Sequence, residues 1–270
     1  MMRRTTRIAA TLALLLVSSF SVAAAPDHYD GAIEHAEARG SLKLAGELFH
    51  VQGLGLHGRH IWVTSVDLAN RKGFLHQFDR VTGRFLRRLE LTDGARYHPG
   101  GLSISGGSIW VPVAEMKPDS SAMLVEIDAA SLTIRRKIPV ADHLGYVAAA
   151  GHTLVAGNWD SKLLYIFDLR PTGRLRVVPN PSTTHYQDMK FVGNKLVAAG
   201  SRTLWSGTVD WIDWPSLKVT RTLRSGAVGL ARPFGRGGAY TSEGLAMEGR
   251  DLYLLPEDGP SRVFRFTIDA

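Results

Sequence analysis

Histidine, carboxylate and amide side chains recur in this sequence beside short apolar segments. Such side chains bind metal ions, transfer protons or hydrogen-bond polar ligands. One group stands at the start of an apolar segment: His50, Gln52, His98, His143, His185, Gln187, Asp188 and Glu243. A second group follows a later segment: Glu115, Asn158, Asp160, Glu257 and Asp258. Each alone also has a structural explanation, as a turn or loop residue, so a site requires that the fold gather them.

The apolar segments belong to a repeat of one strand, a polar or glycine turn and a second strand. Five copies cover residues 53–64, 101–112, 145–156, 187–198 and 244–255. In the first four copies a second hairpin follows, as at 74–80 and 83–92. Four short strands in each of several repeats are typical of β-propeller blades. We therefore predict an all-β fold, a five-bladed β-propeller with four-stranded blades, in which Trp62 and Trp110 pack between blades.

The fifth copy lacks a fourth strand, because the chain ends after the strand at 261–269. A surplus strand at 41–49 precedes the first copy. We predict that this N-terminal strand pairs beside 263–268 in the C-terminal blade, closes the ring and removes two exposed edges. An open array or a sandwich with a frayed N-terminal strand is the alternative. We assign the propeller to residues 41–270 and expect the glycine-rich segment 225–242 to be a long loop.

This fold places both groups of polar residues on one face of the ring. Strands of a blade run alternately up and down, so the loop before strand one and the loop after strand two lie at the same end. The two groups are therefore expected to surround the mouth of the central channel, where they would form a ligand site.

The N-terminus is organised like a cleavable signal peptide. Arg3, Arg4 and Arg7 precede an uncharged, mainly apolar segment that ends in Ala23-Ala24-Ala25, as secretory signals do. We expect a signal peptide at 1–25, a linker at 26–40 and a periplasmic or secreted mature protein. A retained membrane anchor is the alternative for this segment, and no later segment is apolar for long enough to span a bilayer.

Composition excludes several function classes. The chain has no cysteine, so thiol chemistry and thiolate metal sites are excluded. The formal charge is +7, but three of its basic residues lie in the expected signal peptide and the others are scattered. We expect no nucleic-acid partner, because a basic stripe with interleaved aromatic residues is missing, and we expect a monomer. The G-x-S-x-G, H-E-x-x-H and P-loop signatures are also missing.

Several strings together resemble a known family. They are HPGG at 98–101, WVPVAEM at 110–116, DHLG at 142–145, NWDSK at 158–162, YQDMK at 186–190, ARPF at 231–234 and LPEDGPS at 255–261. From about residue 50 onward the chain resembles an uncharacterised family of exported propeller proteins, known as a domain of unknown function. This resemblance implies a propeller and no particular activity.

More distantly, the same residues resemble calcium-dependent propeller hydrolases of the gluconolactonase and paraoxonase type. That resemblance implies a channel calcium ion held by Glu115, Asn158, Asp188 and Glu243.

Two hypotheses about function follow. In the first, the channel face binds a small polar molecule, a peptide or a glycan. In the second, the protein is a metal-dependent, calcium-type hydrolase of lactones or esters, with His98 or His143 as the catalytic base. The fold alone does not choose between them, because propellers host both functions.

Overall fold

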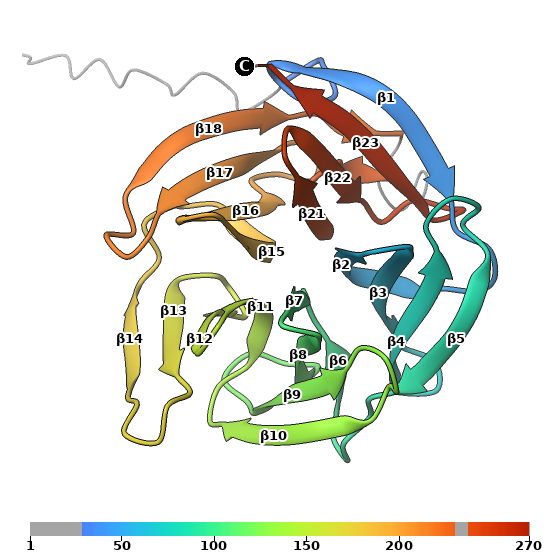
Figure 1. Cartoon of the computed structure of the whole chain (residues 1–270). Coiled ribbons are helices and arrows are strands. Elements are labelled where there is room, and N and C mark those ends of the chain that lie inside the picture. Colours follow the sequence, from blue (N-terminus) through green and yellow to red (C-terminus); the bar gives the residue numbers. More distant parts are fainter. Residues whose placement is uncertain (1–28, 230–236, 270) are drawn as a thin grey trace, which may run out of the picture.

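The computed structural model describes residues 29–229 and 237–269, and these form five β-sheets arranged in a ring (Figure 1). The predicted all-β, five-bladed propeller is confirmed. The expected signal peptide lies outside the described residues. No helix with the length and hydropathy needed to cross a membrane occurs in the part of the chain that the structure describes.

The first four blades follow one another along the chain. Within each blade the strand numbers increase from the innermost strand outward. Blade 1 contains β2 (His50–His57), β3 (His60–Asp67), β4 (Lys72–Asp79) and β5 (Phe85–Glu90). Blade 2 contains β6 (Arg96–Pro99) and β7 (Ser103–Ser105), which both pair with β8 (Ser108–Glu115), then β9 (Ala122–Asp128) and β10 (Ile134–Val140). Blade 3 contains β11 (Leu144–Ala150), β12 (Thr153–Asn158), β13 (Leu163–Asp168) and β14 (Leu175–Pro179). Blade 4 contains β15 (His185–Val192), β16 (Lys195–Ser201), β17 (Gly207–Asp213) and β18 (Val219–Ser225).

Blade 5 joins the two ends of the described chain. It contains β21 (Gly244–Glu248), β22 (Asp251–Leu255), β23 (Arg262–Ile268) and β1 (Ala36–Lys43). Strand β1 pairs antiparallel with β23, with Ser41 opposite Phe264 and Leu42 opposite Val263 (Figure 1). The predicted ring closure is therefore confirmed, and β1 begins at Ala36, within the segment expected to be a linker.

A short ribbon stands between blades 4 and 5. It contains β19 (Ala227–Val228) and β20 (Gly238–Ala239), in the glycine-rich segment 225–242. Residues 230–236 of that segment lie outside the described part of the chain.

The core lies between neighbouring sheets. Strands β3 and β8 are buried along almost their whole length, because both faces of each sheet are covered by adjacent blades. Outer strands such as β5 and β10 are mostly exposed. Trp62 and Trp110 are buried in two of the apolar clusters between blades, as the repeat predicted.

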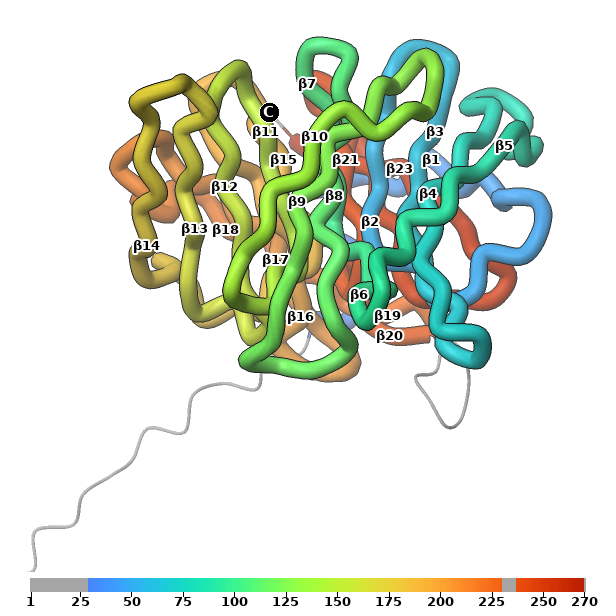
Figure 2. The backbone as a smooth tube through the Cα atoms, turned by 90° about the horizontal axis from the view of Figure 1, so that it is seen from below, coloured from blue at the N-terminus to red at the C-terminus, as the bar shows by residue number. Residues whose placement is uncertain are grey.

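The innermost strands approach closely around the axis. A Cβ atom on Gly101 would lie 2.6 Å from a carboxylate oxygen of Asp188, and one on Gly244 would lie 2.6 Å from Cβ of Leu54. Glycine is therefore required at both positions by the packing of β2, β15 and β21. Seen from the side, the turns gather at two opposite faces of the ring (Figure 2). We call the face at which the innermost strands begin the mouth face.

Candidate functional site

The mouth face gathers side chains from the first and last blades. His50 opens β2, while Glu243 stands directly before β21 and Glu257 shortly after β22. Because β21 and β22 pair with Gly244 opposite Leu255, both glutamates emerge at the same end of their hairpin. Strands β2 and β21 approach closely at the axis and place these glutamates beside His50, as the alternation of propeller strands predicts.

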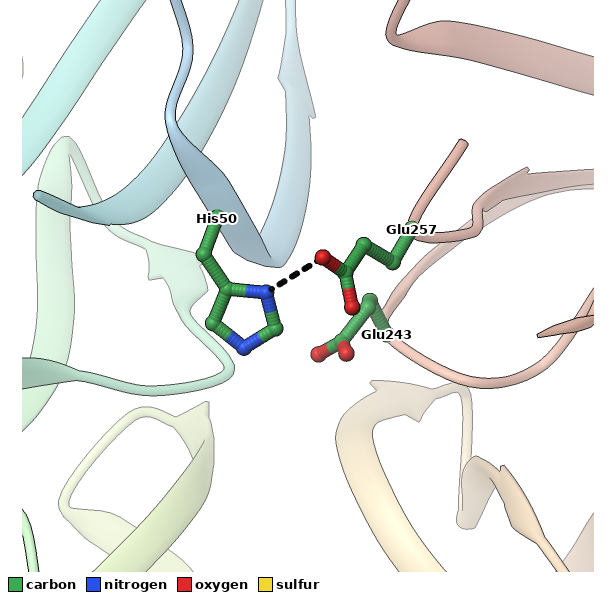
Figure 3. Close-up of side chains that lie close together, drawn as sticks. All are labelled: His50, Glu243 and Glu257. Atoms are coloured by element: carbon green, nitrogen blue, oxygen red, sulfur yellow. Dashed lines mark ion pairs between the residues drawn. The ribbon is translucent and has the colours of Figure 1, made fainter. Parts of the chain in front are cut away.

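His50, Glu243 and Glu257 form a compact cluster, which we call the mouth triad (Figure 3). A ligating atom from each side chain lies within 4.8 Å of the other two. Nδ1 of His50 lies 3.1 Å from Oε1 of Glu257. Glu243 is buried, and the other two side chains are about one-fifth exposed. The triad can hold a cation or exchange protons between imidazole and carboxylate.

Gln52 fixes the protonation of the His50 ring. Its amide nitrogen donates to the carbonyl oxygen of Val51 at 3.1 Å and lies 2.7 Å from Nε2 of His50. The amide therefore donates to Nε2, which acts as the acceptor, and the ring proton sits on Nδ1. Nδ1 lies within ion-pair distance of Oε1 of Glu257, so full protonation of the ring would place a positive charge beside this carboxylate.

A cluster of aromatic side chains, separate from the mouth triad, also lies on the mouth face. The rings of His98 and His143 are 5.6 Å apart, and the exposed Trp159 meets His143 edge-on at 4.5 Å. Burial lowers the pKa of His98 to about 3, with smaller contributions from His143 and His50. Burial also lowers the pKa of His143. Both rings are therefore neutral near pH 7.

The two predicted base candidates differ in their hydrogen bonds. Nδ1 of His143 lies 3.1 Å from the carbonyl oxygen of Lys117, to which it donates. Nδ1 of His98 is buried and makes no hydrogen bond to another residue in the described ranges. The Nδ1–H donation leaves Nε2 of His143 as an acceptor, whereas burial strongly opposes protonation of His98. His143 is therefore the better placed of the two to accept a proton.

A pocket of about 530 Å³ opens beside the mouth triad. His185, Gln187 and Glu257 line it, together with Ser201, Arg202 and Ser242. The volume is in the range of small-molecule sites. Three of the predicted binding residues thus share a single concave surface.

The side chain of Asp188 is buried and has a structural role, and it does not face an open site. Its carboxylate accepts the backbone N–H groups of Leu54 at 3.1 Å, Leu245 at 3.0 Å and Met189 at 2.9 Å. Lys190 pairs with the same carboxylate. Because Asp188 is fully buried and its oxygens are used by these donors, it anchors three innermost strands.

The remaining predicted residues stabilise the loops in which they lie. Oδ1 of Asn158 accepts the N–H groups of Lys162 and Leu163, and Asp160 pairs with Lys162 at 2.7 Å. Asp258 is buried and bonds the backbone and guanidinium of Arg262.

Glu115 is held by neighbours of its own loop. The hydroxyl of Ser121 and the ammonium of Lys117 lower its pKa by stabilising the charged form. Asn158, Asp160, Asp258 and Glu115 therefore each bond within or next to their own loops.

The calcium ligands implied by the distant resemblance do not form one set. Among the described residues, histidine and carboxylate ligands come within 4.8 Å of one another in a group of three only at the mouth triad. Glu115, Asp188 and Glu243 therefore do not meet, because the first two are bound into a loop and a strand anchor. Glu243 alone belongs to both the implied set and the triad.

Sequence reasoning missed Trp159 and Arg202 as mouth-face residues. Trp159 is 43% exposed and follows Asn158 in the loop after β12. A large exposed aromatic side chain in a loop that already carries polar candidates is the signal that would have found it. Arg202 occupies the equivalent loop of blade 4, after β16.

Solved structures with a similar fold support the propeller architecture. A glutaminyl cyclase from Myxococcus xanthus matches 87% of this chain and 96% of its own, with 15% identity and a TM-score of 0.64. A luciferin-regenerating enzyme matches 84% of this chain and 79% of its own, with 10% identity and a TM-score of 0.50. At these identities the likeness shows the fold alone. No curated protein matched the chain.

The family assignment comes from sequence. The model of a family of unknown function, DUF6454, matches residues 22–236. This range includes the first four blades, the mouth-face histidines His50, His98, His143 and His185, and Gln52. It covers most of the chain, so the chain belongs to the DUF6454 family of unknown function.

Proposed function

We propose that this protein is an exported propeller that binds a small polar molecule in the mouth-face pocket. The observation that carries the proposal is the pocket itself, in which Gln187, Arg202 and Glu257 converge from blades 4 and 5. Its lining combines hydrogen-bond donors and acceptors with a cationic and an anionic side chain. A volume of about 530 Å³ suits a small molecule, whereas a peptide or glycan would place only its terminal group there.

The chemistry of the lining defines the ligand further. The guanidinium of Arg202 provides a forked donor for a carboxylate or a similar anion. Glu257, which also lines the pocket, accepts hydrogen bonds from hydroxyl or amino groups. The expected ligand is therefore a small hydroxylated or amino-bearing molecule with one anionic group.

A thermal-shift screen tests this proposal. Sugar acids, hydroxy acids and amino acids are added to the protein, and the unfolding midpoint is measured. A ligand at a concentration of 100 times its Kd stabilises the folded state by about 2.7 kcal/mol, which corresponds to a shift of roughly 5 °C or more at this size. We expect such a shift for the wild type and a much smaller one for Arg202→Ala.

Arg170→Ala is the matched control, because Arg170 is an exposed arginine in the turn between β13 and β14. It should keep the full shift. A panel in which no compound shifts the midpoint, or equal shifts in Arg202→Ala and the wild type, would contradict the proposal.

A metal-dependent hydrolase is a second candidate, favoured by the position of the mouth triad beside the pocket. In this function a cation at the triad would polarise the carbonyl of a lactone or ester, and His143 would accept a proton at Nε2. Turnover of lactone and ester substrates, lost in Glu243→Gln and retained in Glu115→Gln, is the expected result.

Export has its own test. The proposal rests on the basic and apolar residues of the N-terminus, which lie outside the described part of the chain. We expect the full-length precursor to yield a periplasmic or secreted protein that begins near Pro26. Mass spectrometry of the fractionated protein measures this directly, and an uncleaved chain in the cytoplasm would contradict it.

A further inference from the structure

We propose that His50, Glu243 and Glu257 form a binding site for one divalent transition-metal ion of the Zn²⁺ class. One imidazole and two carboxylates are a donor set that zinc accepts in proteins. Ligand atoms around a tetrahedral ion with bonds of 2.0–2.2 Å lie about 3.4 Å from one another. The three side chains already come within 4.8 Å, so small rotations bring them to this geometry.

The site has the open coordination that a ligand-binding or catalytic metal needs. Three protein ligands leave the fourth position for water or a bound molecule. Glu257 belongs to the triad and also lines the mouth-face pocket. An ion at the triad would therefore present its open position toward that pocket.

The donor set also selects among cations. Calcium takes oxygen ligands, usually six to eight of them, whereas the triad offers one ring nitrogen and two carboxylates. Imidazole favours zinc and neighbouring transition metals. The proposed ion therefore differs from the calcium that the distant family resemblance implies, and its ligands differ as well, apart from Glu243.

Gln52 has a defined part in this site. A metal bound at Nδ1 of His50 requires that the ring proton move to Nε2. The side-chain amide of Gln52, which now turns its nitrogen toward Nε2, must then rotate and present its oxygen. Outer partners of this kind orient metal-binding histidines and tune their affinity.

Calorimetry on metal-free protein tests the site with Zn²⁺, Mn²⁺ and Ca²⁺ used separately. We expect one equivalent of Zn²⁺ to bind, Mn²⁺ to bind more weakly and Ca²⁺ to bind weakly or undetectably. Glu243→Gln and Glu257→Gln keep the side-chain shape and should each weaken Zn²⁺ binding by on the order of 100-fold. Elemental analysis of the dialysed protein provides the stoichiometry.

Two control variants test whether Zn²⁺ binds at the mouth triad and not at a neighbouring residue. Glu115→Gln removes a glutamate outside the triad and should leave Zn²⁺ affinity unchanged. Arg202→Ala should also bind Zn²⁺ normally while losing the pocket ligand, which distinguishes failure of the metal site from failure of the proposed function. Circular dichroism confirms that each variant is folded.

The Gln52→Glu variant tests the proposed geometry. A carboxylate there accepts the Nε2 proton without rotation, so Zn²⁺ affinity should rise by about 10-fold. Weaker Zn²⁺ binding in this variant would contradict coordination through Nδ1. The absence of stoichiometric Zn²⁺ binding to the wild type, or equal binding by Glu243→Gln and Glu115→Gln, would overturn the site.

Discussion

At the scale of the residue, several polar side chains are held in environments that change their chemistry. His76 is 1% exposed and its ring meets the hydroxyl of Ser65 at 2.8 Å. Burial lowers the pKa of His76 to about 4, and burial acts in the same direction on His98. These rings are neutral in the folded protein and charged in the unfolded chain at mildly acidic pH.

His76 should therefore make the protein sensitive to acid. Its folded pKa lies below the unfolded value of about 6.5, so the unfolded state binds more protons between these values, and stability falls as the pH drops from about 6.5 to 4. We expect His76 to contribute a loss of roughly 3 kcal/mol by pH 4. Urea unfolding from pH 7 to pH 4 should show a shallower loss in His76→Gln.

The exposed His57 offers the matched substitution for this measurement. His57→Gln should retain the pH dependence of the wild type. Identical pH profiles for His76→Gln and the wild type would show that the buried ring is not responsible for acid sensitivity.

At the scale of the element, the innermost strands are joined by a single carboxylate. Asp188 of β15 accepts backbone N–H groups from β2 and β21, which belong to two other blades. It also neutralises Lys190, a buried ammonium. The contact thus connects blades 1, 4 and 5 near the axis.

Asp188→Asn should destabilise the protein strongly. The amide offers one acceptor oxygen in place of two and leaves the buried Lys190 without its counter-charge, which costs about 3–5 kcal/mol. Denaturant unfolding measures the change. Asp160→Asn, at a surface ion pair, should change stability by less than about 1 kcal/mol, and equal effects of the two substitutions would exclude the anchoring role.

The strand repeat and the ring closure could be predicted from sequence because they depend on periodic apolar residues and on a count of strands. The orientation of individual polar residues could not. Register shifts interrupt β2 between Val51 and Leu54 and β15 between Tyr186 and Asp188. Such bulges break the alternation of side chains, so the sequence did not reveal that Gln187 lines the pocket while Asp188 lies buried at the axis.

All three residues of the mouth triad belong to the predicted set of polar residues. The sequence alone could not single out these three from that set. Which loops meet depends on their lengths and on the rotation between blades. The calcium set was drawn from a resemblance, and it grouped residues such as Asn158 whose oxygen is used inside its own turn. Local turn bonds of this kind are not visible in residue type alone.

At the scale of the whole molecule, the ring is held by the pairing of β1 with β23. Glu37 lies opposite Thr267 in this pair. The natural chain contains no cysteine, so two introduced cysteines would have no competing partner. A Glu37→Cys, Thr267→Cys variant should therefore form a single disulfide. Closing so long a segment stabilises the protein by up to about 5 kcal/mol in the chain-entropy model.

The expected result is a Tm at least about 5 °C above that of the reduced variant, with the shift abolished by reductant. Glu37→Cys alone serves as the control and should show no redox dependence. Failure of the pair to oxidise, or oxidation without any rise in Tm, would count against the observed register.

The mouth triad joins residues from the beginning and the end of the propeller. His50 opens the first blade, whereas Glu243 and Glu257 flank the hairpin of the last. During synthesis His50 leaves the ribosome long before Glu243 and Glu257 do, because most of the propeller separates them in sequence. A chain that stops before Glu243 therefore lacks two of the three proposed ligands, and occupancy of the triad would report that the first and last blades have come together.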